Sequence, residues 1–295
     1  MQNLLFVGGS GLLGNVWLKK MNKSIKIFAT INKKKIKTKR KNLELLKLDL
    51  FNKKKLCQFI EDNNIDTIIN VAGLTNIEQC EKNKKKALKT NVNIVENLRI
   101  AAQKFNVKII HISTDHIFSG KKIGYYSEKS KPFPVNYYSK TKLMAENKIK
   151  QYKKSLIIRT NFFGGKSDTK NSFSEYILNN TMNKKNTYLW NDVYFTPVNM
   201  NFLIEVINKL IIKNVFGIIN IASNDKISKF NFGLKLCKCL KLSNKYLLKK
   251  KEDYNSVKRP KNMSLSNRKL IKIFPSLKKK LFLNYQINDI YKTRL

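Results

Sequence analysis

The chain has 295 residues and a mass of 34.4 kDa, which is enough for one large domain or two modest ones. Hydrophobic residues make up 42% of it, which favours a packed core and argues against wholesale disorder. No apolar run reaches the roughly 18 residues of a membrane span, and the N-terminus lacks the basic start of a secretory signal. We therefore expect a cytoplasmic protein without membrane insertion.

The formal net charge of +41 admits two interpretations, a binder of nucleic acid or membrane surfaces and a drift in composition. The chain has 54 Lys but only 6 Arg, and 37 Asn. A surface that recognises phosphate would be expected to use Arg, whose planar fork binds phosphate with two hydrogen bonds. The triple-Lys runs are also far apart in the sequence. We expect no specific nucleic-acid partner, although weak nonspecific binding at low salt stays open.

Cysteine and histidine are too sparse to suggest a metal site. The four cysteines form no CxxC pair, and the chain has only two histidines. A zinc site or a disulfide framework would need a denser pattern, so we expect no metal and reduced thiols. The residues concerned are Cys57, Cys80, Cys237, Cys239, His111 and His116.

Short apolar runs alternate with longer amphipathic ones through the first half of the chain. This alternation predicts parallel βαβ units, and hence an α/β fold: a Rossmann-type doubly wound sheet with helices on both faces. The expected strands are 4–7, 25–30, 45–48, 67–71, 107–113 and 156–159, and the expected helices are 12–21, 53–63, 84–105 and 138–152.

The alternation loosens after about residue 160. Residues 164–168 are expected to form a loop, followed by helices at 171–183, 199–213 and 228–240 and one more strand at 217–222. The tail 244–295 is Lys-rich with scattered apolar residues. We expect a first domain over 1–160, completed by 197–222, and a smaller, partly interleaved second domain that is mainly 161–295.

A glycine motif follows the first predicted strand at once. Residues 8–14 read GGSGLLG, which places GxxGxxG between a strand and a helix. Glycines there allow a tight turn and a close approach of the backbone to a pyrophosphate at the helix N-terminus. The first domain is therefore expected to bind a dinucleotide through Gly8, Ser10, Gly11, Leu12, Leu13 and Gly14.

The second predicted strand lacks the acid that usually binds the ribose 2′-hydroxyl of NAD. No Asp or Glu occurs in residues 1–43, and Asn32-Lys33-Lys34-Lys35 follows the strand instead. A cationic pocket would accept a 2′-phosphate. We expect NADPH, bound in part by Asn32 and Lys33, and keep NADH open as the alternative.

Tyr138 and Lys142 lie four residues apart, which places both on one face of the predicted helix. A tyrosine hydroxyl has a pKa of about 10, and a nearby ammonium brings it into a useful range for proton transfer at neutral pH. Thr114 adds a hydroxyl at the carboxyl end of the strand 107–113, where doubly wound sheets bind ligands. Tyr137 and Thr141 share the spacing but lack the ammonium. We expect Tyr138, Lys142 and Thr114 to be catalytic.

With the glycine motif, Thr114, Tyr138 and Lys142 in this order, the sequence resembles the extended short-chain dehydrogenase/reductases. Among them it is most similar to the dTDP-4-dehydrorhamnose reductase family. The resemblance covers nearly the whole chain. Ser113–Gly120 resembles STDYVFxG, and Tyr138–Glu146 resembles YGxTKLxGE. Further similar segments are Asn70–Thr75 with Cys80-Glu81, Arg159–Phe162, Asn191-Asp192 with Thr196-Pro197, and the RPxN of Arg259–Asn262 with Leu265.

The resemblance implies reduction of a nucleotide-linked 4-keto-6-deoxy sugar by a nicotinamide cofactor, with Tyr138 as proton donor. It implies that Asn91 supports a proton relay. It also implies cofactor contacts from Asp49, Leu50, Ala72, Gly73, Thr75, Tyr138 and Lys142, and contacts to the sugar or diphosphate from Asp115, His116, Phe162 and Arg259. The expected partner is the nucleotide-sugar substrate, and a homodimer stays open.

The sequence departs from the family pattern mainly where the family contacts the sugar. His116 stands for a Tyr, Phe162 for a Trp, Ser139 for a Gly and Met263 for a Ser. These changes bear on the identity of the sugar more than on the reaction. For His116, a substrate contact and a purely structural role are equally open. Two other functions remain: another extended sugar-nucleotide epimerase or dehydratase, which would lack RPxN, and a non-catalytic cofactor-binding regulatory subunit.

Overall fold

The computed structural model describes residues 2–31, 40–165, 171–251 and 257–292. The chain divides into two compact units. The first consists of Met1–Ser113, Asn136–Ile158 and Asn214–Ile218. The second consists of Thr114–Val135, Arg159–Lys213 and Ile219–Leu295.

A seven-stranded sheet with the order β11-β6-β5-β4-β1-β2-β3 organises the first unit. Neighbouring strands from β3 to β6 are parallel, and the order reverses between β1 and β4. This is the Rossmann arrangement, in which ligands bind at the carboxyl ends of the strands; the expected fold class is confirmed. The strands are β1 (Asn3–Val7), β2 (Lys26–Thr30), β3 (Leu43–Leu46), β4 (Thr67–Asn70), β5 (Lys108–Ile112), β6 (Ser155–Thr160) and β11 (Gly217–Ile221).

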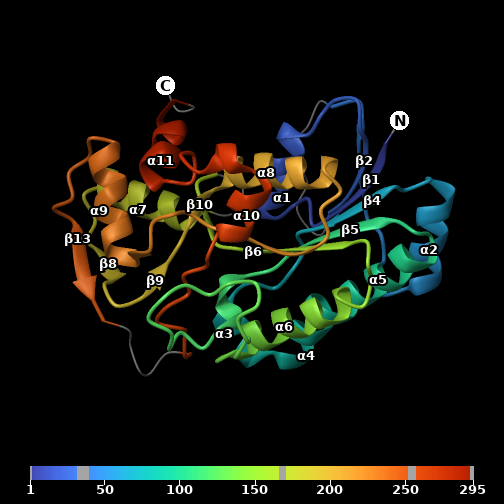
Figure 1. The fold of residues 1–295 in the computed structure, drawn as a ribbon, viewed down its shortest axis with the longest axis horizontal. Coiled ribbons are helices and arrows are strands. Elements are labelled where there is room, and N and C mark those ends of the chain that lie inside the picture. Colours follow the sequence, from blue (N-terminus) through green and yellow to red (C-terminus); the bar gives the residue numbers. More distant parts are fainter. Residues whose placement is uncertain (1, 32–39, 166–170, 252–256, 293–295) are drawn as a thin grey trace. The chain divides into compact units, whose positions relative to one another are not determined.

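Helices cover both faces of this sheet (Figure 1). On one face, Trp17 of α1 (Leu12–Lys20) packs edge-on against Phe6 of β1 at 5.6 Å. On the other face, α2 (Lys53–Asp62), α5 (Ile94–Lys104) and α6 (Tyr137–Ile149) pack side by side. Alternate residues of each strand therefore point to different helices. The buried side chains of this second face include Leu5, Val7, Leu56, Ile60, Val95, Leu98, Ile109, Ala145 and Ile149.

The helix expected over 84–105 is interrupted by a wider turn. It consists of α4 (Lys84–Leu88), a π-helical segment η1 (Lys89–Asn93) and α5. A further helix, α3 (Ile77–Lys82), precedes it and was not expected; Asn76 caps it by accepting a hydrogen bond from the backbone N–H of Gln79 at 2.7 Å. A single π turn inserts an extra residue and re-aims side chains, often at functional sites.

Strand and helix boundaries lie within three residues of expectation, and β3 is shifted as a whole by two residues. The strand expected at 45–48 lies at Leu43–Leu46, because Leu43 pairs with Ile27 and Leu46 with Thr30. Leu48 still packs against the core although it lies beyond the paired segment. Apolar residues therefore located the strand, but backbone pairing decided its ends.

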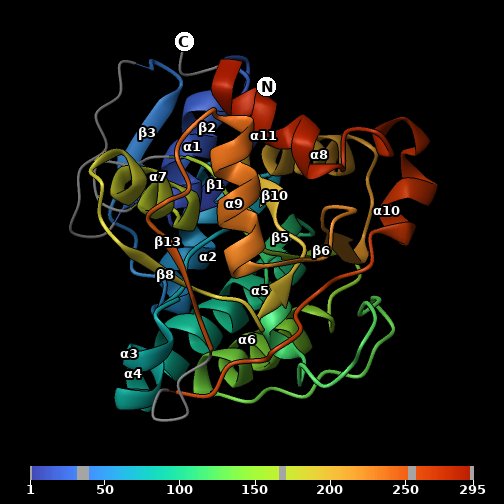
Figure 2. The ribbon, with the colours of Figure 1, turned by 90° about the vertical axis from the view of Figure 1, so that its left-hand side faces the viewer.

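The second unit contains short strand pairs and helices around an aromatic core. Phe232 lies at its centre, with its ring 5.1 Å from that of Phe163, 5.5 Å from that of Phe195 and 5.9 Å from that of Phe173. Helix α9 runs along β8 and β13, which pair in parallel (Figure 2). The elements are η2 (Asp115–Ile117), β7 (Phe162–Phe163), α7 (Phe173–Met182), β8 (Thr187–Trp190), β9 (Tyr194–Phe195), β10 (Val198–Asn199), α8 (Met200–Ile212), β12 (Ile227–Ser228), α9 (Lys229–Cys239), β13 (Leu247–Lys250), α10 (Arg268–Ile273), η3 (Pro275–Leu277) and α11 (Leu283–Lys292).

The tail 244–295 contributes to the core of the second unit, which its Lys-rich composition did not indicate. Leu247 of β13 and Leu283 and Ile287 of α11 are buried in the aromatic core. Gln286 of α11 accepts a hydrogen bond from the backbone N–H of Asn199 at 2.6 Å. Met263, Leu265, Leu270, Leu277 and Leu281 are buried as well, so apolar side chains spaced among the lysines fix the tail.

Within the described part of the chain, no helix has the length and apolar character that a membrane crossing requires.

Candidate active site

The glycine loop between β1 and α1 is packed so tightly that side chains are excluded. Gly8 has a φ of +97°, and a Cβ on it would lie 2.7 Å from the backbone nitrogen of Ala72. A Cβ on Gly14 would lie 2.3 Å from the carbonyl oxygen of Gly8. Helix α1 begins at Leu12 without a side-chain cap and without an acid in its first turn. The N-terminal N–H groups of a helix attract an anion, so this cradle fits a pyrophosphate.

The other residues expected to bind the cofactor follow the carboxyl ends of neighbouring strands. Ala72 lies next to Gly8, and Gly73 and Thr75 are exposed in the loop after β4. Leu50 is buried, and its carbonyl accepts a hydrogen bond from Asn97 at 2.9 Å; Asp49 is exposed. Ser10 is half-buried in the glycine loop. Asn32 and Lys33 lie outside the described residues.

Helix α6 presents Tyr138 and Lys142 from the same face, one turn apart, and both side chains are buried. The helix begins at a cap in which the Asn136 side chain accepts hydrogen bonds from the backbone N–H and the hydroxyl of Ser139, at 2.9 and 2.7 Å. Such a cap fixes the first turn, where Tyr138 lies. The helix expected at 138–152 therefore carries the pair as the spacing predicted.

The Lys142 amine lies among buried polar groups of the sheet. Its Nζ donates to the carbonyl of Ile112 at 2.7 Å and lies 3.3 Å from Nε2 of His111. Burial lowers the pKa of Lys142 to about 8, although Glu146 on the same helix acts in the opposite direction. Burial, and then the charge of Lys142, lower the pKa of His111 well below its ordinary value. Lys142 can therefore change its protonation state close to neutral pH, whereas His111 stays neutral.

Asn91 lies in the π-helical segment and joins two parts of the candidate site. Its Oδ1 accepts from the backbone N–H of Leu74 at 2.7 Å. Its Nδ2 donates to the carbonyl of Leu74 and to the hydroxyl of Thr141, both at 3.0 Å. Asn91 thus ties the loop after β4 to α6, the helix of Tyr138 and Lys142.

In the second unit, the segment that follows β5 forms a compact polar turn. The hydroxyl of Thr114 accepts from the backbone N–H of His116 at 3.2 Å and lies 3.3 Å from Oδ1 of Asp115. Oδ2 of Asp115 accepts from the amide of Asn161 at 2.9 Å. Burial raises the pKa of Asp115 to about 6. Thr114, Asp115 and His116 are thus held in one turn.

Two cations act on this turn, and sequence reasoning singled out only one of them. Burial first, and then the charges of Lys229 and Arg259, lower the pKa of His116 to about 3, so its 3.9 Å contact with Asp115 is not an ion pair at neutral pH. Lys229 begins α9, and its Nζ lies 3.4 Å from the ring centre of Phe195. It was missed because a Lys in this Lys-rich chain carries almost no signal on its own.

The RPxN segment is anchored by its asparagine. The amide of Asn262 donates to the carbonyls of Lys122 and Gly124 at 2.5 and 2.8 Å. Gly120 has a φ of +80°, and a Cβ on it would lie 2.5 Å from the backbone nitrogen of Lys261. Arg259 lies over the Trp190 ring at 5.4 Å. Phe162 is half-buried in β7.

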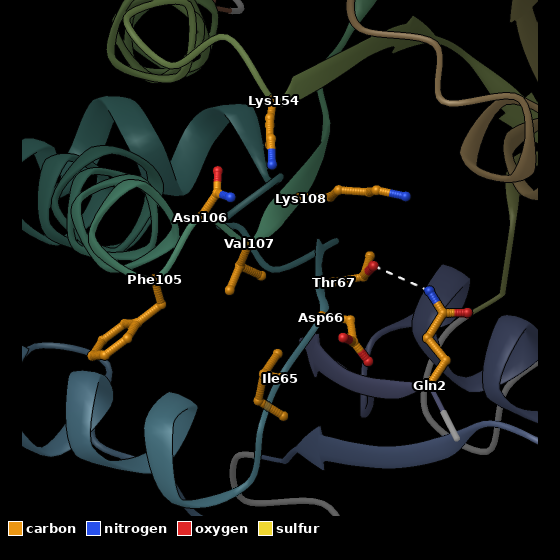
Figure 3. A pocket seen from close by; sticks show the side chains of 9 residues that line it. All are labelled: Gln2, Ile65, Asp66, Thr67, Phe105, Asn106, Val107, Lys108 and Lys154. Carbon is orange, nitrogen blue, oxygen red and sulfur yellow. Dashed lines mark hydrogen bonds between the residues drawn. The ribbon is translucent and has the colours of Figure 1, made fainter.

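A hollow of about 500 Å³ opens at the other edge of the sheet, at the amino ends of the strands (Figure 3). Its rim includes Gln2, Asp66, Lys108 and Lys154, and Gln2 donates to the Thr67 hydroxyl at 3.3 Å. Ligands of doubly wound sheets bind at the carboxyl ends, so this hollow is not the candidate site.

Comparison with known proteins gives a family match over most of the chain. The family model described as the RmlD substrate binding domain matches residues 1–282. A dTDP-4-dehydrorhamnose reductase of Aggregatibacter actinomycetemcomitans is 28% identical over 243 residues, which are 79% of this chain and 78% of that protein.

Solved structures agree with this match. The crystal structure of a hypothetical dTDP-4-dehydrorhamnose reductase from Sulfolobus tokodaii is 31% identical, with a TM-score of 0.82 over 93% of this chain and 95% of that one. A dTDP-4-dehydrorhamnose reductase of Bacillus anthracis in complex with NADP also has a TM-score of 0.82, at 22% identity and over 99% of this chain and 100% of that one. At 22% identity, the likeness to the Bacillus anthracis protein shows a shared fold alone.

Proposed function

This chain belongs to the RmlD substrate-binding family, and from that premise we propose that it is an NADPH-dependent reductase of a nucleotide-linked 4-keto-6-deoxy sugar. The single observation that carries the proposal is the buried pair of Tyr138 and Lys142, one turn apart on a capped helix. The pair argues against a non-catalytic binding protein, which would need Lys142 for the cofactor ribose but would not need the Tyr138 hydroxyl as a proton donor. The names of the relatives favour dTDP as the nucleotide.

The glycine cradle supports the choice of a dinucleotide cofactor. A Cβ at Gly8 or Gly14 would collide with backbone atoms, so the loop leaves its N–H groups close to any bound pyrophosphate. Residues 8–14, Ala72 and Gly73 would hold the cofactor, together with Lys142 on its nicotinamide ribose. NADPH, when bound, supplies the hydride for reduction of the C4 carbonyl. The lack of acids in residues 1–43 favours the 2′-phosphorylated form.

Tyr138 is the proposed proton donor. Its hydroxyl gives a proton to the oxygen of the C4 carbonyl as that oxygen gains negative charge. The Lys142 ammonium favours the phenolate that Tyr138 becomes, because an opposite charge nearby stabilises the ionised form. The Thr114 hydroxyl hydrogen-bonds the same oxygen and stabilises the charge in the transition state. Asn91 is a positioning residue in this scheme, since it ties α6 to the loop after β4.

The polar turn of the second unit is proposed to recognise the nucleotide sugar. Asp115 and neutral His116 offer acceptors and a donor to sugar hydroxyls, and Phe162 offers an apolar face. Arg259 and Lys229 supply positive charge suited to a diphosphate. The family carries Tyr and Trp where this chain has His116 and Phe162. This protein is therefore expected to differ from its relatives in the sugar that it accepts more than in the reaction.

The test is NADPH oxidation with a panel of dTDP-, GDP- and UDP-linked 4-keto-6-deoxy sugars, followed by absorbance. We expect turnover with at least one of them and none with NADPH alone. Tight NADPH binding without turnover on any sugar would contradict the proposal and favour a regulatory subunit. Conversion of a sugar without consumption of NADPH would favour an epimerase or dehydratase.

A further inference from the structure

A buried chain of polar groups leads from the sheet to the Lys142 amine. Asn70 and His111 face each other on the neighbouring strands β4 and β5. The Asn70 amide nitrogen lies 3.1 Å from Nδ1 of His111, and Nε2 of His111 lies 3.3 Å from Nζ of Lys142. Asn70 and His111 have no exposed surface, and Lys142 has only 6%. Because Asn70 and His111 are out of reach of water, each must find its donor or acceptor within the chain.

The direction of the first hydrogen bond follows from the backbone. The N–H of Ala72 donates to Oδ1 of Asn70 at 3.0 Å, which identifies that atom as the oxygen. The other end of the amide is then the NH₂ group, and it donates to Nδ1 of His111. A histidine that accepts at Nδ1 and is neutral carries its proton on Nε2. The low pKa of His111 excludes the doubly protonated ring at neutral pH.

The Nε2–H of His111 therefore points at the Lys142 amine. An ammonium has three donors and no acceptor, so it cannot accept this hydrogen bond. A neutral amine can: its lone pair accepts from His111 while one N–H still donates to the carbonyl of Ile112 at 2.7 Å. Reversing the chain would turn the Asn70 NH₂ group toward the N–H of Ala72 and leave a buried donor unsatisfied, which is costly.

We propose that His111 is a positioning residue whose Nε2–H, fixed by Asn70, orients the Lys142 amine and favours its neutral form. The Glu146 carboxylate, on the same helix as Lys142, acts in the opposite direction and favours the ammonium. Glu146 is itself held by the Ser113 hydroxyl at 2.6 Å. Lys142 thus lies between the Glu146 carboxylate, which favours the charged ammonium, and the His111 ring, which favours the neutral amine.

The balance between the ammonium and the amine of Lys142 gives His111 a role in the reaction. This role rests on the proposed function. After Tyr138 has given its proton to the substrate oxygen, the phenolate must recover one. The Lys142 ammonium can transfer a proton to it, which leaves Tyr138 as the phenol and Lys142 as the amine. The His111 N–H stabilises that amine until water returns a proton to it.

The first test needs neither cofactor nor substrate. Long-range ¹⁵N–¹H NMR spectra of histidine rings distinguish the two neutral forms and the charged ring, and this chain has only two histidines. A His116→Gln variant assigns the signals. We expect His111 to be neutral with its proton on Nε2 from about pH 6 to 9. A proton on Nδ1, or a charged ring in that range, would overturn the proposal whatever the enzyme does.

The Asn70→Asp variant should reverse the direction of the hydrogen bonds that run from residue 70 through His111 to Lys142. A carboxylate offers only acceptors, so His111 must place a proton on Nδ1 and Nε2 becomes an acceptor for the Lys142 ammonium, or the ring becomes doubly protonated. Asn63→Asp adds the same charge at the end of α2 and is expected to leave the His111 spectrum unchanged. If the His111 ring of the Asn70→Asp variant still carried its proton on Nε2 alone, Asn70 would not be the residue that fixes the tautomer of His111.

The pH profile of kcat tests the effect on Lys142. His111→Phe removes the N–H that favours the amine but keeps a flat ring in the same space. Lys142 then retains its proton to higher pH, so the basic limb moves upward by about half to one pH unit, the worth of one neutral hydrogen bond. An unmoved or lowered limb would refute the role of His111, whereas absence of turnover in the unmodified protein would refute the proposed function instead.

Discussion

Tyr137 and Tyr138 are adjacent in the sequence but lie in different surroundings. Tyr138 is buried on the face of α6 that carries Lys142. Tyr137 is half-buried; its backbone N–H donates to Glu81 at 2.6 Å, and Lys84 lies 5.6 Å from the centre of its ring. The two residues therefore form a matched pair in which only Tyr138 has a buried lysine one turn away on its own helix.

Tyr138→Phe removes one oxygen and preserves the packing of the ring. If Tyr138 donates the proton, kcat should fall by about 10²–10⁴-fold, the usual cost of losing a general acid. NADPH affinity should change little, because the lost interaction belongs mainly to the transition state. Steady-state kinetics and a fluorescence titration of NADPH measure the two quantities. Tyr137→Phe is the control, and equal damage from both variants would mean that the proton donor is not Tyr138.

The cofactor preference depends on residues outside the described part of the chain, and it is a prediction from sequence. Changing Lys33 and Lys34 together to Ala should weaken NADPH binding and leave NADH nearly unaffected, because only NADPH carries a 2′-phosphate. Titration of the variant with each cofactor gives the ratio of the two affinities. Equal loss for both cofactors, or tighter binding of NADH by the unmodified protein, would refute the preference.

Residues of the candidate site were predictable where a motif fixes their spacing, and not where the fold brings them together. Tyr138 and Lys142 follow from helical periodicity, and their shared buried face agrees with it. His111 and Asn70 become partners only through the pairing of β4 with β5. Lys229 lies more than a hundred residues from Asp115, on which its charge acts. No local pattern could have indicated either relation.

At the scale of elements, the glycine loop between β1 and α1 leaves no room for a side chain at Gly8 or Gly14. Gly14→Ala would place a methyl group 2.3 Å from the Gly8 carbonyl oxygen, so the loop or α1 must shift. We expect a loss of about 1–3 kcal/mol in the free energy of unfolding, typical of overpacking. NADPH affinity should fall by about tenfold or more, since a displaced helix end no longer meets the pyrophosphate.

Urea unfolding and NADPH titration measure both effects, and Gly124→Ala is the control. The nearest atom to a Cβ on Gly124 is 3.9 Å away, at the flexible end of the Lys122 side chain. That variant should retain both stability and affinity. If Gly14→Ala retained its stability and NADPH affinity as Gly124→Ala should, a methyl group would fit at residue 14 and the predicted collision with the Gly8 carbonyl oxygen would be wrong.

Elements with a strong apolar pattern were predictable, and those that depend on distant partners were not. The strands β1, β4 and β5 and the helices α2 and α8 lie within one or two residues of their expected bounds. The pair β8 and β13 joins Thr187 to Leu247 across sixty residues, and β13 is half lysine. The π turn at Asn91 shifts the phase of the apolar positions, but α4 before it has only five residues, too few for that shift to be recognised in the sequence.

At the scale of the whole molecule, we attribute the charge of +41 to composition and not to a surface that recognises nucleic acid. Lysines scattered along the chain neutralise phosphates without recognising bases. We expect any retention of DNA to be independent of sequence and to vanish by moderate salt. Electrophoretic mobility shifts at increasing salt measure this, and a sequence-specific complex at physiological salt would contradict the compositional interpretation.

The proposed reaction transfers a hydride from NADPH to C4 of a nucleotide-linked sugar, and an isotope label on the cofactor follows that hydride. The protein is incubated with a dTDP-4-keto-6-deoxy sugar and NADPH deuterated at C4 of the nicotinamide, in separate reactions for the two stereochemical positions. Mass spectrometry and NMR of the product then locate the label. We predict one deuterium on C4 of the sugar from one of the two labelled cofactors. A product without deuterium from either cofactor, or no product at all, would refute hydride transfer from NADPH to the sugar.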